Sequence, residues 1–266
     1  MCCIVVVIIS RCCSIGLPDI GAVSIGFEIK NATKSNTALY FLMRDFSMTL
    51  KLGKNDVYRS EIEAAQKATG IDGSAIAALI DAEAAKIGSG ANKGQWDKDS
   101  YNPTSKAGGM TQFLEPTWEG HAKKPGHLLN TRGKAAGLIT AADKVATGKK
   151  ADLLKLRFDP LLSIVSAAEY GVDNLKALDK AGVLPRNLTD DQRARYMYLA
   201  HHEGASGATG FLNGTKTYTR AKLVGQVGAT AADKYIKAAG GKTSAAYRLW
   251  LNEYMDKKIA PSNFRS

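Results

Sequence analysis

Apolar residues recur at helical spacing along most of the chain after residue 55, whereas a loose strand-like alternation is confined to residues 18–52. The helical pattern dominates and strand signals beyond residue 55 are nearly absent, so the main domain is expected to be mainly α-helical. The spacing predicts helices over 57–69, 75–87, 151–156, 161–180, 190–203, 228–239 and 243–257.

The pattern divides the chain into two parts. Residues 1–54 are expected to be an N-terminal extension with one or two short strands, outside the core fold, and residues 55–266 are expected to form the main domain with C-terminal helices. Ser74 is placed to cap the second helix. A segment rich in glycine, asparagine and aspartate over 88–106 predicts a loop.

Composition and charge narrow the class of protein. The chain has 266 residues, of which 45% are hydrophobic, and carries a net charge of +11, which favours an anionic partner such as nucleic acid, an anionic membrane or a cell-wall polymer. The basic residues are dispersed, without a recognition helix or an aromatic-basic platform, so nucleic-acid binding is not expected. No apolar run reaches eighteen residues, so stable membrane insertion is not expected either.

All four cysteines lie within the first thirteen residues, so the rest of the chain uses no disulfide or thiolate chemistry. They lack CxxC spacing and a nearby histidine, and we expect no metal site there. The apolar stretch Cys2–Ser10 is short and lacks a basic region and a cleavage site, so it is a poor secretory signal. A weak signal-anchor, a leader, or an extension upstream of a start at Met48 remain the alternatives.

A glutamate lies on the apolar face of the second predicted helix. Glu83 shares that face with Ile76, Leu79 and Ile80, whereas Asp81 points elsewhere. A carboxylate there loses solvation, which raises its pKa and keeps it protonated near neutral pH, as a general acid in glycoside cleavage must be. The many alanines blur the edge of the face, so a solvated Glu83 is the alternative.

The segment that follows carries a motif. Residues 102–118 read NPTSKAGGMTQFLEPTW, which resembles the signature NPxAxSxxGAxGLMQxxPxT of soluble lytic transglycosylases and goose-type lysozymes. Three further elements agree in order: the helix IAALIDAEAA around Glu83, the run from Phe158-Asp159-Pro160 to Ala168-Glu169-Tyr170, and the sequence LAHHEG over 199–204, where the family has AYNAG. The resemblance covers about residues 57–215.

This resemblance implies a lysozyme-like, mainly α fold and cleavage of the β-1,4 bond between N-acetylmuramic acid and N-acetylglucosamine in the glycan strands of peptidoglycan. Glu83 would be the catalytic acid, and we expect no cofactor and a monomer. By the same resemblance, the substrate-binding candidates are Ser105, Met110, Gln112, Tyr170, Tyr198, His201 and His202.

The chain departs from the family pattern in three places. The long loop after Glu83 brings Asp97 and Asp99 near the motif, and in this respect the chain is similar to goose-type lysozymes, which carry an acid there. The order GMTQ in place of GLMQ predicts a slightly shifted substrate strand. His201 and His202 replace a Tyr-Asn pair, which would make their role sensitive to pH.

These departures leave three functions open. A lytic transglycosylase would use Glu83 as acid and base and leave a 1,6-anhydro end, whereas a hydrolysing muramidase would need Asp97 or Asp99 about 6.5–9.5 Å from Glu83 to hold a water. A glycan-binding module that has lost catalysis would not need Glu83. The basic charge and the absence of a clear cleavable signal suit an endolysin that is made in a bacterial cytoplasm and acts on the cell wall, with a bacterial transglycosylase as the alternative.

Other acids and histidines are expected to have ordinary roles. Glu169 and Glu203 would be structural acids that accept hydrogen bonds. The run His201-His202-Glu203 is not expected to bind metal, because adjacent helical side chains point about 100° apart and HExxH spacing is absent. His121 and His127 lie in a lysine- and glycine-rich segment and are expected to be solvated.

Overall fold

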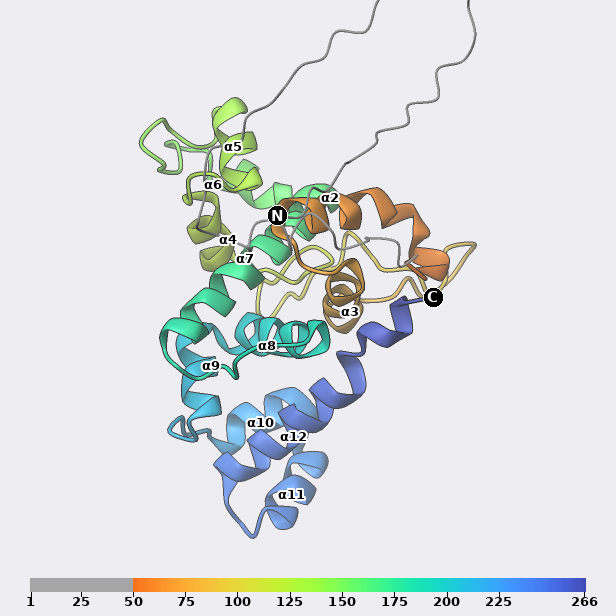
Figure 1. Cartoon of the computed structure of the whole chain (residues 1–266), viewed down its shortest axis with the longest axis vertical. Coiled ribbons are helices and arrows are strands. Elements are labelled where there is room, and N and C mark those ends of the chain that lie inside the picture. Colours follow the sequence, from red (N-terminus) through yellow and green to blue (C-terminus); the bar gives the residue numbers. More distant parts are fainter. Residues whose placement is uncertain (1–49) are drawn as a thin grey trace, which may run out of the picture. The chain divides into compact units, whose positions relative to one another are not determined.

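The computed structural model describes residues 50–266 (Figure 1). The expected strands before residue 50, the cysteine-containing segment and Met48 lie outside the described residues. Within 50–266 every regular element is a helix, and β pairing is limited to isolated bridges. The expectation of a mainly α-helical fold is therefore confirmed.

The helices expected from hydrophobic spacing are present, and four short helices, α4, α5, α9 and α10, were not predicted. None of the helices within residues 50–266 combines the length and the apolarity needed to cross a bilayer. The elements are η1 (Gly53–Tyr58), α2 (Arg59–Thr69), α3 (Gly73–Glu83), α4 (Glu115–Ala122), α5 (Leu128–Ala135), α6 (Lys150–Lys155), η2 (Leu156–Phe158), α7 (Pro160–Lys180), α8 (Asp190–Glu203), α9 (Ala205–Leu212), α10 (Arg220–Val227), α11 (Ala229–Ala238), α12 (Thr243–Lys258) and η3 (Pro261–Phe264).

Helix α3 is the central apolar helix. Its residues 73–80 are all buried, because α2, α7, α8, α12 and η3 contact it. The N-cap is Asp72, whose side chain accepts a hydrogen bond from the Ser74 amide at 3.0 Å, so the expectation that Ser74 itself is the cap is wrong. The helix ends at Glu83 rather than near residue 87, because Ala84 adopts an extended conformation.

Helix α7 packs most extensively against α2 and α8, so these helices surround α3 (Figure 1). Its start follows from the sequence, since Asp159 caps it by accepting from the Leu162 amide at 2.9 Å and Pro160 occupies the first turn. Helices α10, α11 and α12 pack on one another, and α12 contacts both α8 and α3. The C-terminal helices therefore reach the helix that carries Glu83.

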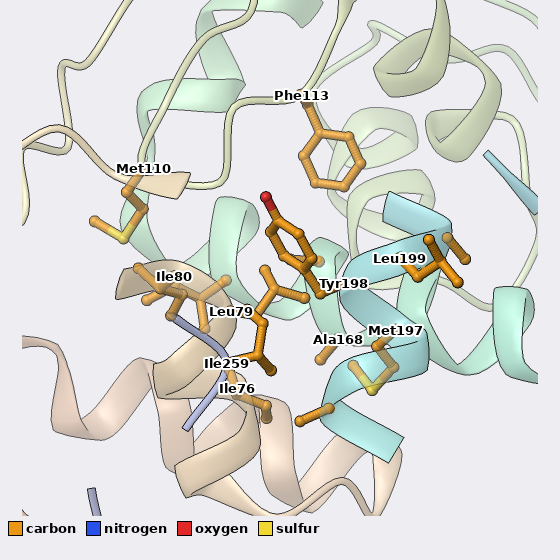
Figure 2. Close-up of a cluster of buried hydrophobic side chains, with 14 of the residues drawn as sticks. Ile76, Leu79, Ile80, Met110, Phe113, Ala168, Met197, Tyr198, Leu199 and Ile259 are labelled. Carbon is orange, nitrogen blue, oxygen red and sulfur yellow. The ribbon is translucent and has the colours of Figure 1, made fainter. Parts of the chain in front are cut away.

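The hydrophobic core lies between α3 and α8. Leu79 and Ile80 of α3 lie beside Tyr198 of α8. The side chain of Met110 covers them from the loop over residues 102–114, which we call the motif loop (Figure 2). The Tyr198 hydroxyl points away from α8, toward the loop between Met110 and Phe113. This packing fixes the relative positions of the three elements that form the candidate site.

Candidate active site

A cavity of about 130 Å³ opens where α3 and α8 end and the motif loop passes α7. It brings together five residues that the sequence singled out, from four separate parts of the chain. Its lining consists of Glu83, Gln112, Phe113, Leu114, Thr117, Tyr170, His201 and His202.

Glu83 is the last residue of α3 and is partly buried at the cavity wall. Within the described residues its carboxyl group forms no hydrogen bond and no ion pair. Burial raises the pKa of this carboxyl from its ordinary value to about 7, and the negative end of the α3 dipole favours the neutral form in the same way. Near neutral pH a large share of the molecules therefore carries a protonated, unengaged acid beside an open space.

Two tyrosines lie close to this acid. The Tyr254 hydroxyl donates to the main-chain oxygen of Ala82 at 3.1 Å, and the rings of Tyr198 and Tyr254 stack with centroids 5.7 Å apart. Burial, and next the negative charge of Glu83, raises the pKa of Tyr198, so its hydroxyl stays neutral. Two neutral tyrosines thus lie near the carboxyl group without donating a hydrogen bond to it.

Gln112 presents an unpaired acceptor in the cavity lining. Its Nε2 donates to the main-chain oxygen of Gly109 at 2.8 Å and lies 3.1 Å from Oγ of Ser100. These bonds hold the side chain inside its own loop and leave Oε1 without a protein partner in the described part of the chain. Gln112 also has a positive φ of 48°, which marks the loop as tightly specified.

The motif loop is held against η2 by a close backbone approach. Gly109 has φ of +77°, and a Cβ there would overlap the main-chain oxygen of Arg157. Arg157 is buried, and its Nη1 donates to the main-chain oxygens of Lys106 at 2.7 Å and Phe113 at 3.0 Å. The glycine pair in the motif therefore has a steric reason, and Arg157, which the sequence did not single out, fixes both ends of the loop.

The two histidines at the end of α8 are neutral at neutral pH. His201 donates from Nε2 to the main-chain oxygen of Thr111 at 2.9 Å, and burial lowers its pKa to about 4. His202 stacks on Tyr198 at 5.9 Å, and burial lowers its pKa as well. The expectation that the histidine pair titrates near neutral pH is therefore not supported, because both rings lose solvation.

Glu203 follows the histidines and is ionised. Its side chain is fully enclosed, with Lys216 at 2.7 Å, Lys222 at 3.0 Å and the Tyr247 hydroxyl at 2.6 Å. Burial alone would raise the pKa, but the hydrogen bonds from Lys216, Tyr247 and Lys222 outweigh it and lower the pKa to about 2. Glu203 is thus a structural anion, in keeping with the sequence analysis, and cannot donate a proton.

Three of the expected substrate-binding residues lie outside the cavity lining. Met110 and Tyr198 belong to the core, with 0% and 3% exposure, so neither is accessible to a sugar, in contrast to the expectation. Ser105 is exposed elsewhere on the loop, where its Oγ accepts from the Ala107 amide at 3.3 Å.

The expected second carboxylates also lie outside the lining. Asp97 accepts a hydrogen bond from the Asp99 amide at 3.0 Å and thereby closes a turn. Asp99 is exposed and pairs with Lys98 at 2.8 Å.

Sequence reasoning missed three residues of the lining, Phe113, Leu114 and Thr117. Phe113 and Leu114 directly follow Gln112, and Thr117 lies near the end of the motif over 102–118, so their places in the motif are the signal that would have indicated them.

Comparison of the chain with models of known protein families, with curated proteins and with solved structures finds no significant match. The function proposed below therefore rests on the cavity and on the order of the motifs.

Proposed function

We propose that the chain cleaves the β-1,4 bond between N-acetylmuramic acid and N-acetylglucosamine in peptidoglycan, with Glu83 as the proton donor. The observation that carries this proposal is the state of Glu83: a carboxyl group on a cavity wall, without a hydrogen bond or ion pair among the described residues, with a pKa raised to about 7. A glycosidic oxygen needs a proton as its bond to C1 breaks, and an acid with such a pKa can supply it at neutral pH.

The same residue can complete the reaction as a lytic transglycosylase. After Glu83 protonates the leaving oxygen, the sugar develops positive charge at C1 and Glu83 becomes a carboxylate. This carboxylate takes the proton of the sugar's own C6 hydroxyl, whose oxygen then bonds to C1. The products are a free 4-hydroxyl on one strand and a 1,6-anhydro end on the other, and Glu83 is protonated again.

The surroundings of Glu83 favour this route over hydrolysis. Inversion requires a second carboxylate that holds a water on the opposite face of the sugar. Asp97 and Asp99 do not line the cavity and are engaged in their own turn. The other acid near the site, Glu203, is neutralised by two lysines. A mechanism with one carboxyl group therefore fits the site better.

The cavity also offers groups that suit an N-acetylated sugar. Oε1 of Gln112 is free to accept from an acetamido N–H or a hydroxyl, and the partly exposed ring of Tyr170 offers an apolar face to a pyranose ring. The net charge of +11 would favour approach to an anionic cell wall. These features support peptidoglycan as the substrate class and an endolysin or a bacterial transglycosylase as the kind of enzyme.

The test is digestion of purified sacculi by the full chain and by Glu83→Gln, followed by mass spectrometry of the released muropeptides. Glu63→Gln, which changes an exposed glutamate on α2, is the matched control. We expect anhydro-muramic products from the wild type and the control, and none from Glu83→Gln. Reducing ends that disappear in an Asp97→Asn/Asp99→Asn double variant would establish hydrolysis instead. The absence of products from the wild type would overturn both the transglycosylase and the muramidase hypotheses and leave a glycan-binding module.

A further inference from the structure

A second cluster of chemically active side chains is formed by residues of α4, of α7 and of the connection between α4 and α5. His121 is the penultimate residue of α4, His127 immediately precedes α5, and Asp173 belongs to α7. One potential ligand atom from each of the three lies within 4.8 Å of the others. Both histidines were expected to be solvated, but His121 is 1% exposed and His127 is partly buried.

The two imidazoles of this cluster are not satisfied by the protein. Their ring centroids lie 4.5 Å apart, and Nδ1 of each is buried without a hydrogen-bond partner. A buried polar atom that lacks a partner is costly, and such atoms are rare in folded proteins.

A fourth group, Glu169, orients His121. Glu169 lies one turn before Asp173 on α7, and its Oε2 is 3.3 Å from Nε2 of His121 and 4.0 Å from Nδ1 of His127. Its other oxygen accepts from the Leu128 amide at 3.0 Å, which fixes the carboxylate in place. Asp173 already binds a cationic group, because Nζ of Lys124 lies 2.6 Å from its Oδ2. Glu169 thus engages Nε2 of His121 and leaves Nδ1 of that ring for a ligand, beside His127 and Asp173.

We propose that His121, His127 and Asp173 bind one divalent transition-metal ion, Zn²⁺, which ties the connection between α4 and α5 to α7. Two imidazole nitrogens and one carboxylate oxygen form a three-ligand set that suits zinc, with a water as the fourth ligand. At ligand distances of about 2.0 Å, tetrahedral ligand atoms are about 3.3 Å apart. The cluster must therefore contract, and the partly exposed His127 and Asp173 can rotate inward as Lys124 moves away.

This site would be independent of the proposed reaction, because none of its three ligands lines the cavity around Glu83. It would hold α4, which supplies Thr117 to the cavity, against α7, which supplies Tyr170. Metal binding is thus expected to stabilise the fold near the cavity, and its measurement does not depend on glycan cleavage.

The test is a calorimetric titration of the full chain, freed of metal with EDTA, with zinc chloride. We expect one zinc equivalent per chain and a higher Tm in its presence. His127→Ala and the isosteric Asp173→Asn should each weaken binding by about 100-fold. Asp179→Asn, an exposed acid on the same helix, is the control and should bind like the wild type. Circular dichroism establishes that each variant is folded.

The cysteines near the N-terminus require a separate measurement, since thiolates bind zinc. The same protein loaded with Co²⁺ should show the visible absorption of a nitrogen and oxygen ligand set, without the ultraviolet band of a thiolate–cobalt bond. A thiolate band, one zinc equivalent retained by both variants, or no zinc bound by the wild type would each overturn the proposal.

Discussion

Nε2 of His201 donates a hydrogen bond to the main-chain oxygen of Thr111 across 2.9 Å, so the end of α8 holds the residue that precedes Gln112. The Thr111 hydroxyl in turn lies 2.8 Å from Oγ of Ser163 on α7. One loop residue is thus fixed by two helices from separate parts of the chain. This arrangement positions Gln112 at the cavity without using the Gln112 side chain itself.

Replacement of His201 tests this positioning. His201→Ala removes the donor and leaves the Thr111 oxygen unpaired, at a cost of about 1–3 kcal/mol. We expect weaker glycan binding, measured by calorimetry with a soluble peptidoglycan fragment. His201→Gln, whose amide can donate over a similar reach, should recover part of the affinity. Equal affinity of the alanine variant and the wild type would contradict a positioning role.

Replacement of Glu83 should change how stability depends on pH. In the unfolded chain its pKa returns to the ordinary value of 4.5, whereas in the folded chain it is about 7. The raised pKa therefore leaves the free energy of unfolding unchanged below about pH 4.5, where the carboxyl is protonated in both states. It lowers the free energy of unfolding progressively up to about pH 7, and by on the order of 3 kcal/mol above that pH. Relative to that of the wild type, the free energy of unfolding of Glu83→Gln should rise by this amount as the pH is raised from about 4 to about 8, measured by urea denaturation. A constant difference between the two proteins would show that Glu83 ionises normally.

The activity should follow the same group. If protonated Glu83 is the acid, kcat/KM on dye-labelled sacculi should fall as the pH rises through about 7. The histidines should not shape this limb of the profile, because burial keeps the pKa of His201 at about 4. A rate that increases with pH up to about 9 would be incompatible with Glu83 as the proton donor.

Gly109 should not tolerate a side chain. Its φ of +77° and the overlap of a Cβ with the Arg157 main-chain oxygen predict that Gly109→Ala lowers the free energy of unfolding by on the order of 3 kcal/mol. Gly120→Ala is the control, since Gly120 lies in α4 with open space around its Cβ position. That variant should be neutral or more stable by about 0.5–1 kcal/mol. Similar Tm values for the two variants would disprove the steric argument.

The enclosed anion Glu203 should be structurally important. Glu203→Gln leaves Lys216, Lys222 and the Tyr247 hydroxyl without their common partner, and we expect a loss of about 3 kcal/mol at neutral pH. The lowered pKa of about 2 means that the wild type keeps this stabilisation at all pH values above about 4.5 and loses it as the pH falls through about 2. Glu253→Gln, at an exposed position on α12, should change stability by less than about 0.5 kcal/mol in the same denaturation experiment.

The sequence was informative where one strong physical signal dominates. An acid at the edge of an apolar helical stripe identified Glu83, and the glycine-rich motif identified Gln112, because burial and tight backbone geometry leave clear patterns. The positions of Tyr170, His201 and His202 followed from the order of the motifs. The structure brings these five residues to one cavity.

The sequence was less informative where tertiary packing overrides local preference. Helix α9 contains two glycines and has weak intrinsic propensity, yet Ala208 and Phe211 are buried and hold it in place. Helix α4 was missed for the same reason, and with it the burial of His121, since a side chain's burial cannot be read from a segment expected to be a loop. Met110 looked like a cleft residue only because the motif does not show which side chains point inward.

Arg265 lies against the beginning of α3: its Nε donates to Oγ of Ser74 at 2.9 Å, and its Nη1 pairs with Asp191 at 2.9 Å. Partners 191 positions apart cannot meet while a ribosome is still adding the residues between them. The helix that carries Glu83 therefore remains incompletely anchored on the nascent chain, and long-range closure of this kind slows folding. Anchoring of the first turn of α3 is therefore completed only after residue 265 has emerged from the exit tunnel.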